Sequence, residues 1–286
     1  MRNYQKHRTY HLRRKRYHLE PREKLLFLFL FIFLAIWLLF RTTNIDKKET
    51  TLRQPTMQRF LEIAIQPIGS TMYIWGGGWN DGDEKSGTGS TRIGVSPIWE
   101  AFAKEQDASY DYEKYRYERE LGLDCSGYVG WVVYNLFETE DGKDGYVTFS
   151  TEMAENFANR GWGKLYKNPK QFFVGDIVSM EGHVWICLGT CEDGSVLLVH
   201  SSPPGVSICG TELSTRQGDS IAVQLAKTFM ETYYKEWQTT YPNRSVSQTY
   251  LEEVTVLRWN VETLEDVIKY QQLSGEEILQ ILSETL

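Results

Sequence analysis

The sequence predicts an α+β fold in which N-terminal helices pack on an antiparallel β-meander sheet. Apolar residues recur at helical spacing in residues 56–66, and they fill most positions of residues 125–136. Short apolar runs, partly β-branched and separated by turn residues, follow between residues 174 and 210. Because the helices come first along the chain and the strands follow, we expect a helix to cover one face of the sheet.

The composition is that of a globular protein, because 41% of the 286 residues are hydrophobic and 14% are aromatic. The net charge of -7 is unevenly distributed along the chain. Residues 1–24 hold nine Lys or Arg against two Glu, which gives +7, so the remainder carries -14. The sequence therefore divides into a basic leader and an acidic folded part.

A transmembrane anchor is predicted directly after the leader. Residues 25–40 are sixteen uncharged apolar residues, and as a helix they would span about 24 Å. Lys24 and Arg41 can extend toward the two surfaces of a bilayer, and Trp37 suits an interface. The alternative is a cleavable signal peptide, which the long leader and the missing small-residue cleavage site disfavour.

The charge pattern also predicts localisation. An excess of Lys and Arg before the anchor indicates that residues 1–24 are cytoplasmic and that the remainder lies outside. The expected protein is thus a single-pass cell-membrane protein with its folded part outside, or a secreted protein if the segment is cleaved. Because the basic block adjoins an apolar run, we interpret it as a topology signal and do not expect nucleic acid as a partner.

The folded part is expected to begin after a polar linker, residues 41–56. The first amphipathic helix, residues 56–66, ends at Pro67 and Gly69. A short β-prone segment and a glycine-rich loop follow, and this loop lacks the glycine patterns of phosphate-binding loops. Residues 97–121 are acidic and rich in Tyr and are expected to be partly helical.

A second helix is expected over residues 150–161, with Ser150 as its N-cap and Gly161 as its stop. Strands are predicted in the runs VGDIVSM, HVWICLG, SVLLVHSS and GVSICG, which together form the antiparallel meander.

The C-terminal part is predicted to hold a helix and a loop in residues 213–250 and a last strand in residues 251–260. Residues 261–286 form an acidic helical tail in this prediction, and we favour solvated charged faces over a partner-binding surface for it.

The four cysteines allow several interpretations. If Cys125 is a working thiol, at most one disulfide remains, with Cys191 and Cys209 as the favoured pair, although buried reduced thiols, Cys187 among them, are preferred slightly. The His and Cys residues between positions 183 and 209 lack the spacing of common zinc modules, so no metal ion and no cofactor is expected.

Cys125 is the candidate nucleophile because it stands at the start of a predicted buried helix. A helix N-terminus favours a thiolate, and the first backbone N–H groups of a helix are free to face an oxyanion. Asp124 and Ser126 can cap or line this terminus, and Gly127 permits close approach of another chain or a substrate. The alternative is an inert buried thiol.

Only His183 and His200 lie outside the leader among the five histidines. His183 starts one predicted strand and His200 ends the next, so an antiparallel hairpin brings the two imidazoles together. One can then act as a base while the other orients it. A single strand histidine is more often a satisfied polar core residue, so the argument depends on the three residues together.

These residues carry a resemblance to a known family. The elements Tyr73-Ile74-Trp75-Gly76-Gly77, Asp124-Cys125-Ser126-Gly127-Tyr128, Ser150, Gly175-Asp176-Ile177-Val178, Gly182-His183-Val184 and Val199-His200 occur in the order and rough spacing of the NlpC family. The chain resembles a member of this family of papain-like, peptidoglycan-cleaving cysteine endopeptidases. The resemblance covers residues 57–212, or residues 57–260 if the last strand belongs to the domain.

The resemblance implies a circularly permuted papain-like catalytic domain that cleaves peptidoglycan stem peptides, commonly between γ-D-glutamate and a diamino acid. It implies Cys125 as nucleophile, His183 as base and His200 as the orienting residue. Tyr73 would help to form the oxyanion hole, and Asp124 and Ser126 would help to hold the amino end of the substrate, while Trp75 and Gly77 support the loop.

This sequence departs from the family pattern in a long insertion, residues 78–122, and in an extended C-terminal region, either of which could cap the groove. A non-catalytic peptidoglycan-binding or scaffold protein that keeps the fold is the alternative function. An acyltransferase or amidase with another substrate is a third hypothesis, since the same three residues serve related acyl chemistry.

Overall fold

The computed structural model describes residues 55–137, 145–215 and 218–286. They belong to a compact unit that spans Gln54–Leu286. The predicted leader at 1–24, the anchor at 25–40 and nearly all of the linker at 41–56 lie outside the described residues.

One finding contradicts the predicted single-pass membrane localisation. Within the described ranges, no helix combines the length and the apolar content that are needed to cross a bilayer.

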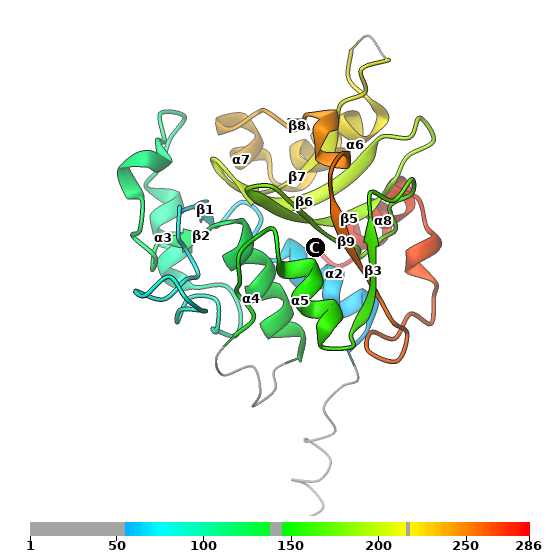
Figure 1. The fold of residues 1–286 in the computed structure, drawn as a ribbon. Helices are drawn as coiled ribbons and strands as arrows, with labels where there is room; N and C mark the ends of the chain where they lie inside the picture. The colour runs from blue at the N-terminus through cyan, green and yellow to red at the C-terminus, as the bar shows by residue number, and fades with distance from the viewer. Residues whose placement is uncertain (1–54, 138–144, 216–217) are drawn as a thin grey trace, which may run out of the picture. The chain divides into compact units, whose positions relative to one another are not determined.

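The core of the unit is a curled, mainly antiparallel sheet (Figure 1). Its strand order is β2-β1-β7-β6-β5-β4-β9-β3, and β8 pairs with β7. In chain order the strands are β1 (Met72–Tyr73), β2 (Gly122–Leu123), β3 (Gly163–Lys167), β4 (Ile177–Met180), β5 (His183–Thr190), β6 (Val196–Ser202), β7 (Gly205–Thr211), β8 (Ser245–Val246) and β9 (Thr255–Trp259).

The predicted meander is observed in β4 to β7, where each strand pairs antiparallel with the next. The predicted last strand is β9, which inserts between β4 and β3. Strand β3 was not predicted, because its sequence, GKLYK, alternates only weakly and most of its side chains face solvent.

The helices gather on the sheet from several sides (Figure 1). They are α2 (Met57–Ile65), α3 (Pro97–Lys104), α4 (Cys125–Phe137), α5 (Met153–Asn159), α6 (Ile221–Tyr233), α7 (Lys235–Thr240) and α8 (Gly275–Ser283). The predicted helix at 125–136 is α4, which is buried on nearly all sides and packs against α2, β5 and β6. The tertiary environment thus explains why α4 shows apolar residues all round rather than on one stripe.

The two faces of the sheet carry different clusters. Val184 and Ile186 of β5 belong to the main core, which α2, α4, α6 and α8 cover. Trp185 and Cys187, which alternate with them, belong to a smaller cluster on the opposite face. His183 and His200 stand at alternate positions that match this second face, on β5 and β6.

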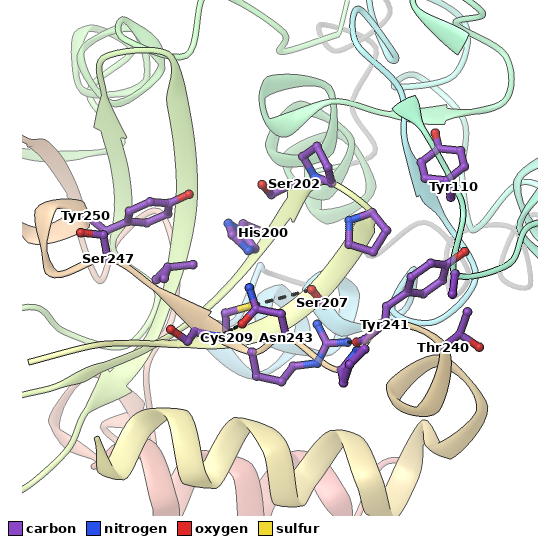
Figure 2. Close-up of a pocket in the computed structure, with 17 residues that line it drawn as sticks. Tyr110, His200, Ser202, Ser207, Cys209, Thr240, Tyr241, Asn243, Ser247 and Tyr250 are labelled. Atoms are coloured by element: carbon purple, nitrogen blue, oxygen red, sulfur yellow. Dashed lines mark hydrogen bonds between the residues drawn. The ribbon is translucent and has the colours of Figure 1, made fainter. Parts of the chain in front are cut away.

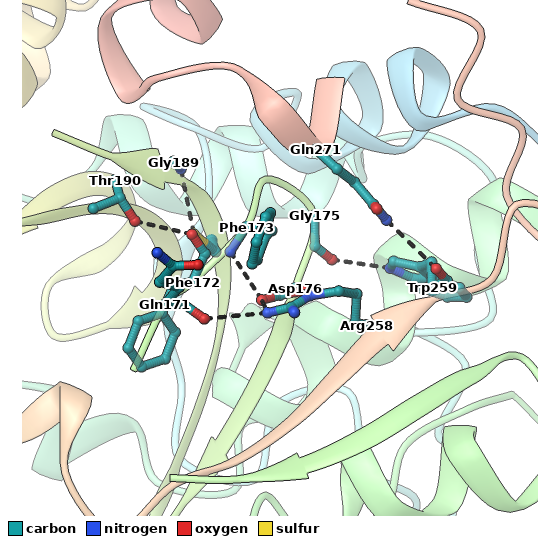
Figure 3. A network of polar contacts seen from close by, with 11 residues as sticks. Gln171, Phe172, Phe173, Gly175, Asp176, Gly189, Thr190, Arg258, Trp259 and Gln271 are labelled. Carbon is teal, nitrogen blue, oxygen red and sulfur yellow. Dashed lines mark hydrogen bonds and ion pairs between the residues drawn. The ribbon is translucent and has the colours of Figure 1, made fainter. Parts of the chain in front are cut away.

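A buried ion pair ties the start of the meander to β9 (Figure 3). Arg258 donates two hydrogen bonds to Asp176, at 3.0 and 2.8 Å, and the carboxylate also accepts from the backbone N–H of Phe173. Asp176 is fully buried, so the Gly175-Asp176 element of the family resemblance has a structural role in this chain.

Two further expectations differ from the structure. Helix α5 begins at Met153 with Glu152 as its N-cap, and Ser150 lies in the preceding turn, because the chain completes that turn before the helix starts. In the tail at 261–286, α8 is the one α-helix among the described residues, and Ile278, Leu279 and Leu282 are buried in the main core. The tail is therefore not only a set of solvated acidic faces, because its helix also packs into the core.

Candidate functional site

The N-terminus of α4 opens into a cavity of about 280 Å³. Cys125, the first residue of α4, contributes its thiol, and Tyr73 of β1 faces the same space. The remaining lining residues are Trp75, Gly76, Trp79, Asp83, Tyr117, Asp124, Ser126, Phe149, Ser150 and Gly182. Because Gly182 precedes β5, this cavity joins the helix terminus to the beginning of the second meander strand.

Asp124 holds the first turn of α4 against the glycine-rich loop. Its carboxylate accepts hydrogen bonds from the backbone N–H groups of Gly76 and Gly127, at 3.2 and 2.7 Å, and from the Ser126 hydroxyl at 2.8 Å. The Ser126 hydroxyl in turn accepts from the Trp79 indole N–H at 3.0 Å. The helix terminus is therefore fixed in position by a buried network rather than by a single cap.

The Cys125 side chain is 7% exposed. Burial raises its pKa well above the ordinary value, and the neighbouring Asp124 carboxylate raises it further. The backbone N–H of Val184, with those of Ser126 and Cys125, lies near the sulfur and lowers the pKa, but these groups only partly offset the increase. The resting site therefore holds a neutral thiol, and a base must remove its proton before it can act as a nucleophile.

The two histidines form the pair that the hairpin prediction anticipated. His183 Nε2 lies 2.9 Å from His200 Nδ1, and the rings meet edge to face at 5.1 Å. Tyr250 packs against both rings, at 5.3 Å from His183 and 6.0 Å from His200. The three rings therefore form one aromatic cluster.

Burial keeps both imidazoles neutral. It lowers the pKa of His183 to about 4. The pKa of His200 lies well below its ordinary value because of burial first, and because of the nearby His183 and Arg244. Since His183 uses Nε2 in the pair, its Nδ1 is the ring nitrogen that remains to accept a proton.

Cys125 lies beside the start of β5, the strand that His183 begins, but it does not hydrogen-bond to His183. The sulfur meets the N–H of Val184, the next residue after His183 along β5. Within the described part of the chain, no hydrogen bond links the thiol to either imidazole. Catalytic contacts in unliganded sites are often long and tighten when substrate binds.

The other three predicted site residues also surround this helix terminus. Tyr73 is buried beside Cys125, and burial raises the pKa of its phenol, with smaller contributions from Cys125 and Asp124. Asp124 and Ser126 line the cavity, yet their polar atoms bond within the protein. A role for these two residues in holding the amino end of a substrate stays a prediction.

Sequence reasoning missed several residues of the site. Trp79, Tyr117 and Phe149 line the cavity, and Trp75, expected to support the loop, is 43% exposed there. The richness of residues 97–121 in Tyr was visible in the sequence, but no periodic pattern indicated which of them face the cavity. Tyr250 and Arg244 lie in the stretch between residue 212 and β9, where the family resemblance offered no motif.

Comparisons of the chain with known protein families, with curated proteins and with solved structures found no match.

Proposed function

We propose that the protein is a cysteine endopeptidase of the papain-like, NlpC-type class that cleaves an amide bond in peptidoglycan stem peptides, with γ-D-glutamyl to diamino acid as the bond. The circularly permuted papain-like arrangement is part of this proposal. The observation that carries it is the meeting of three features: a thiol at a helix N-terminus, the first residues of β5, and the His183–His200 pair.

In this mechanism, His183 Nδ1 takes the proton of the Cys125 thiol as the sulfur attacks the carbonyl carbon of the substrate. The carbon–nitrogen bond breaks, and the leaving amine receives the proton from His183, which leaves a thioester on Cys125. His183 then takes a proton from water as the water attacks the thioester, and the thiol is restored with release of the acid. His200 accepts the Nε2–H of His183 throughout and keeps Nδ1 directed at the reaction.

The test is cleavage of purified peptidoglycan by the full-length chain, followed by mass spectrometry of the released muropeptides. The Cys125→Ala variant is expected to lose release by at least about 10³-fold. Cys191→Ala is the matched control, because Cys191 is also a buried free thiol but lies outside the cavity. Equal release by folded Cys125→Ala and by the unaltered chain would remove Cys125 from the mechanism.

The raised pKa of Cys125 also suits a non-catalytic protein that keeps the fold. Alkylation by iodoacetamide separates the two functions without any substrate. A thiol that His183 deprotonates is alkylated about tenfold or more slowly in His183→Ala than in the unaltered chain. A structural thiol reacts slowly in both proteins, and that result would favour the non-catalytic function.

A further inference from the structure

A second cavity, of about 550 Å³, lies beside His200 (Figure 2). We call it the Arg244 cavity. Its wall combines hydroxyl, amide and aromatic groups from β6, β7 and the segment after α7. The lining residues are Ala108, Tyr110, His200, Ser202, Pro203, Pro204, Ser207, Cys209, Thr240, Tyr241, Pro242, Asn243, Arg244, Ser245, Val246, Ser247 and Tyr250.

Arg244 is the only Arg or Lys in this wall, and it is only 1% exposed. Its Nε–H donates to the side-chain oxygen of Gln238, and an Nη2–H donates to the backbone carbonyl of Tyr241. Its guanidinium also lies close to the Cys209 side chain. A guanidinium has about five N–H donors, so these three contacts leave about two donors for another group.

The positive charge of Arg244 is not paired with a carboxylate in the part of the chain that the structure describes. Burial also holds the pKa of the Cys209 thiol above its usual value despite the adjacent Arg244, so this sulfur is neutral. A buried cation that only neutral partners contact is costly, and an anionic ligand would lower that cost.

We propose that the Arg244 cavity binds a carboxylate group, with Arg244 as its charge partner. The remaining guanidinium donors can form charge-assisted hydrogen bonds with the oxygens of a carboxylate. The cavity is much larger than one carboxylate, and the rings of Tyr110, Tyr241 and Tyr250 supply surface for the carbon atoms attached to it. An amino acid or peptide end therefore fits the cavity better than a bare inorganic anion does.

The position of the cavity connects this ligand to the histidine pair. Ser207 of β7 is the register partner of His200 on β6, and both side chains line the Arg244 cavity (Figure 2). A carboxylate bound there lies next to the orienting imidazole and opposes the electrostatic effect of Arg244 on it. Binding is therefore expected to alter the basicity of the His200–His183 pair as well as to position a ligand.

The carboxylate can come from two sources. It can belong to the stem peptide itself, and this alternative rests on the proposed function. It can also belong to a separate small acid that regulates the site. The chemistry that Arg244 recognises is the same in both cases. The experiment therefore first measures binding without turnover, so that it stands even if the chain is not a peptidase.

The binding experiment uses the full-length Cys125→Ala variant and isothermal titration calorimetry with two probes, N-acetyl-D-alanine and its neutral amide. The acid is expected to bind about tenfold or more tightly than the amide, since charge-assisted hydrogen bonds exceed neutral ones. Arg244→Gln should abolish this preference. Arg92→Gln is the matched control, because Arg92 is exposed and is not among the residues that line the cavity.

If Arg244→Gln does not fold, the acid and the amide can still be compared on the unaltered cavity. Arg244→Lys then supplies a second variant, which retains the charge but loses the paired donors. Equal affinity for acid and amide, or binding of neither, would overturn the proposal.

Cleavage assays then identify the source. If the substrate supplies the carboxylate, amidation of the stem peptide raises KM in the unaltered chain but not in Arg244→Gln. If a separate acid supplies it, added N-acetyl-D-alanine changes kcat equally for free and amidated peptides. Either result supports the carboxylate site. Acid preference in calorimetry without any cleavage would retain the site and reject the proposed peptidase.

Discussion

The His183–His200 pair makes a specific prediction about pH. Unfolded imidazoles take up protons below a pH of about 6.5, whereas native His183 stays neutral down to about 4. Between these values the unfolded state binds more protons, so the free energy of unfolding falls as pH falls. We expect His183 to account for roughly 2–3 kcal/mol of this loss between pH 7 and pH 4.

Urea denaturation of the full-length chain and of His183→Gln at several pH values measures this contribution. The variant can be less stable at pH 7, but its stability should fall less steeply toward pH 4, because it lacks one titrating group. Parallel curves for the two proteins would mean that His183 is not held neutral by burial.

At the level of single residues, the sequence predicted part of the site. It placed His183 and His200 at the paired ends of two strands, and they lie 2.9 Å apart. The hydrogen bond from Gly76 to Asp124 was not predictable, since it joins positions separated by 48 residues. The charge of Arg244 gave no sign of its burial, because only the folded chain decides which arginines leave solvent.

At the level of elements, the junction between α4 and the glycine-rich loop depends on Gly127. The segment that approaches this glycine is the chain's own loop, since a Cβ at Gly127 would lie 2.0 Å from the carbonyl oxygen of Gly77, whereas the approach of another chain or a substrate stays a prediction. Ala favours a helix over Gly by about 1 kcal/mol, but the overlap would displace the loop. We expect Gly127→Ala to lower the free energy of unfolding by about 1–3 kcal/mol.

Gly82→Ala is the matched control for this prediction, since its nearest contact would be the Asn80 side chain at 3.5 Å. Urea denaturation should show a change within about 0.5 kcal/mol for this surface variant. The displaced loop also carries Trp75 and Trp79 of the Cys125 cavity, so Gly127→Ala should reduce the rate of Cys125 alkylation. Unchanged stability and alkylation would show that the junction adapts freely.

Some strands could be predicted from local sequence patterns alone, and others could not. Strands β5, β6 and β7 contain short apolar runs that are buried on both faces and bounded by turns, so local sequence predicted them. Strand β3 depends on pairing with β9 across a long sequence separation, and its own residues are mostly polar or exposed. The order of the sheet, with β9 between β4 and β3, follows from such distant pairing and has no local signal.

At the scale of the whole molecule, the tail completes the folded unit. The backbone of Glu265 exchanges hydrogen bonds with Pro55 and Met57, so the tail pairs with the beginning of the unit. Helix α8 then packs on β5 and α6, beside the strand that begins with His183. Its acidic exposed face led to the prediction of a solvated tail, while its three buried aliphatic residues match the opposite face of the same helix.

Removal of α8 is therefore expected to destabilise the entire unit. Ile278, Leu279 and Leu282 are buried, and burial of an aliphatic side chain contributes about 1.5–3 kcal/mol. Deletion of residues 275–286 should cost about 5 kcal/mol or more, which is comparable with the stability of a typical domain. The urea midpoint should fall sharply or the cooperative transition should disappear.

Deletion of residues 284–286 is the control, because these three residues are exposed and follow the helix. This shorter deletion should change the stability by less than about 0.5 kcal/mol. If the longer deletion left the urea midpoint unchanged, α8 would be an appendage. The geometry of β5 and of His183 would then depend on the meander and on α4, which also packs against β5 from the core side.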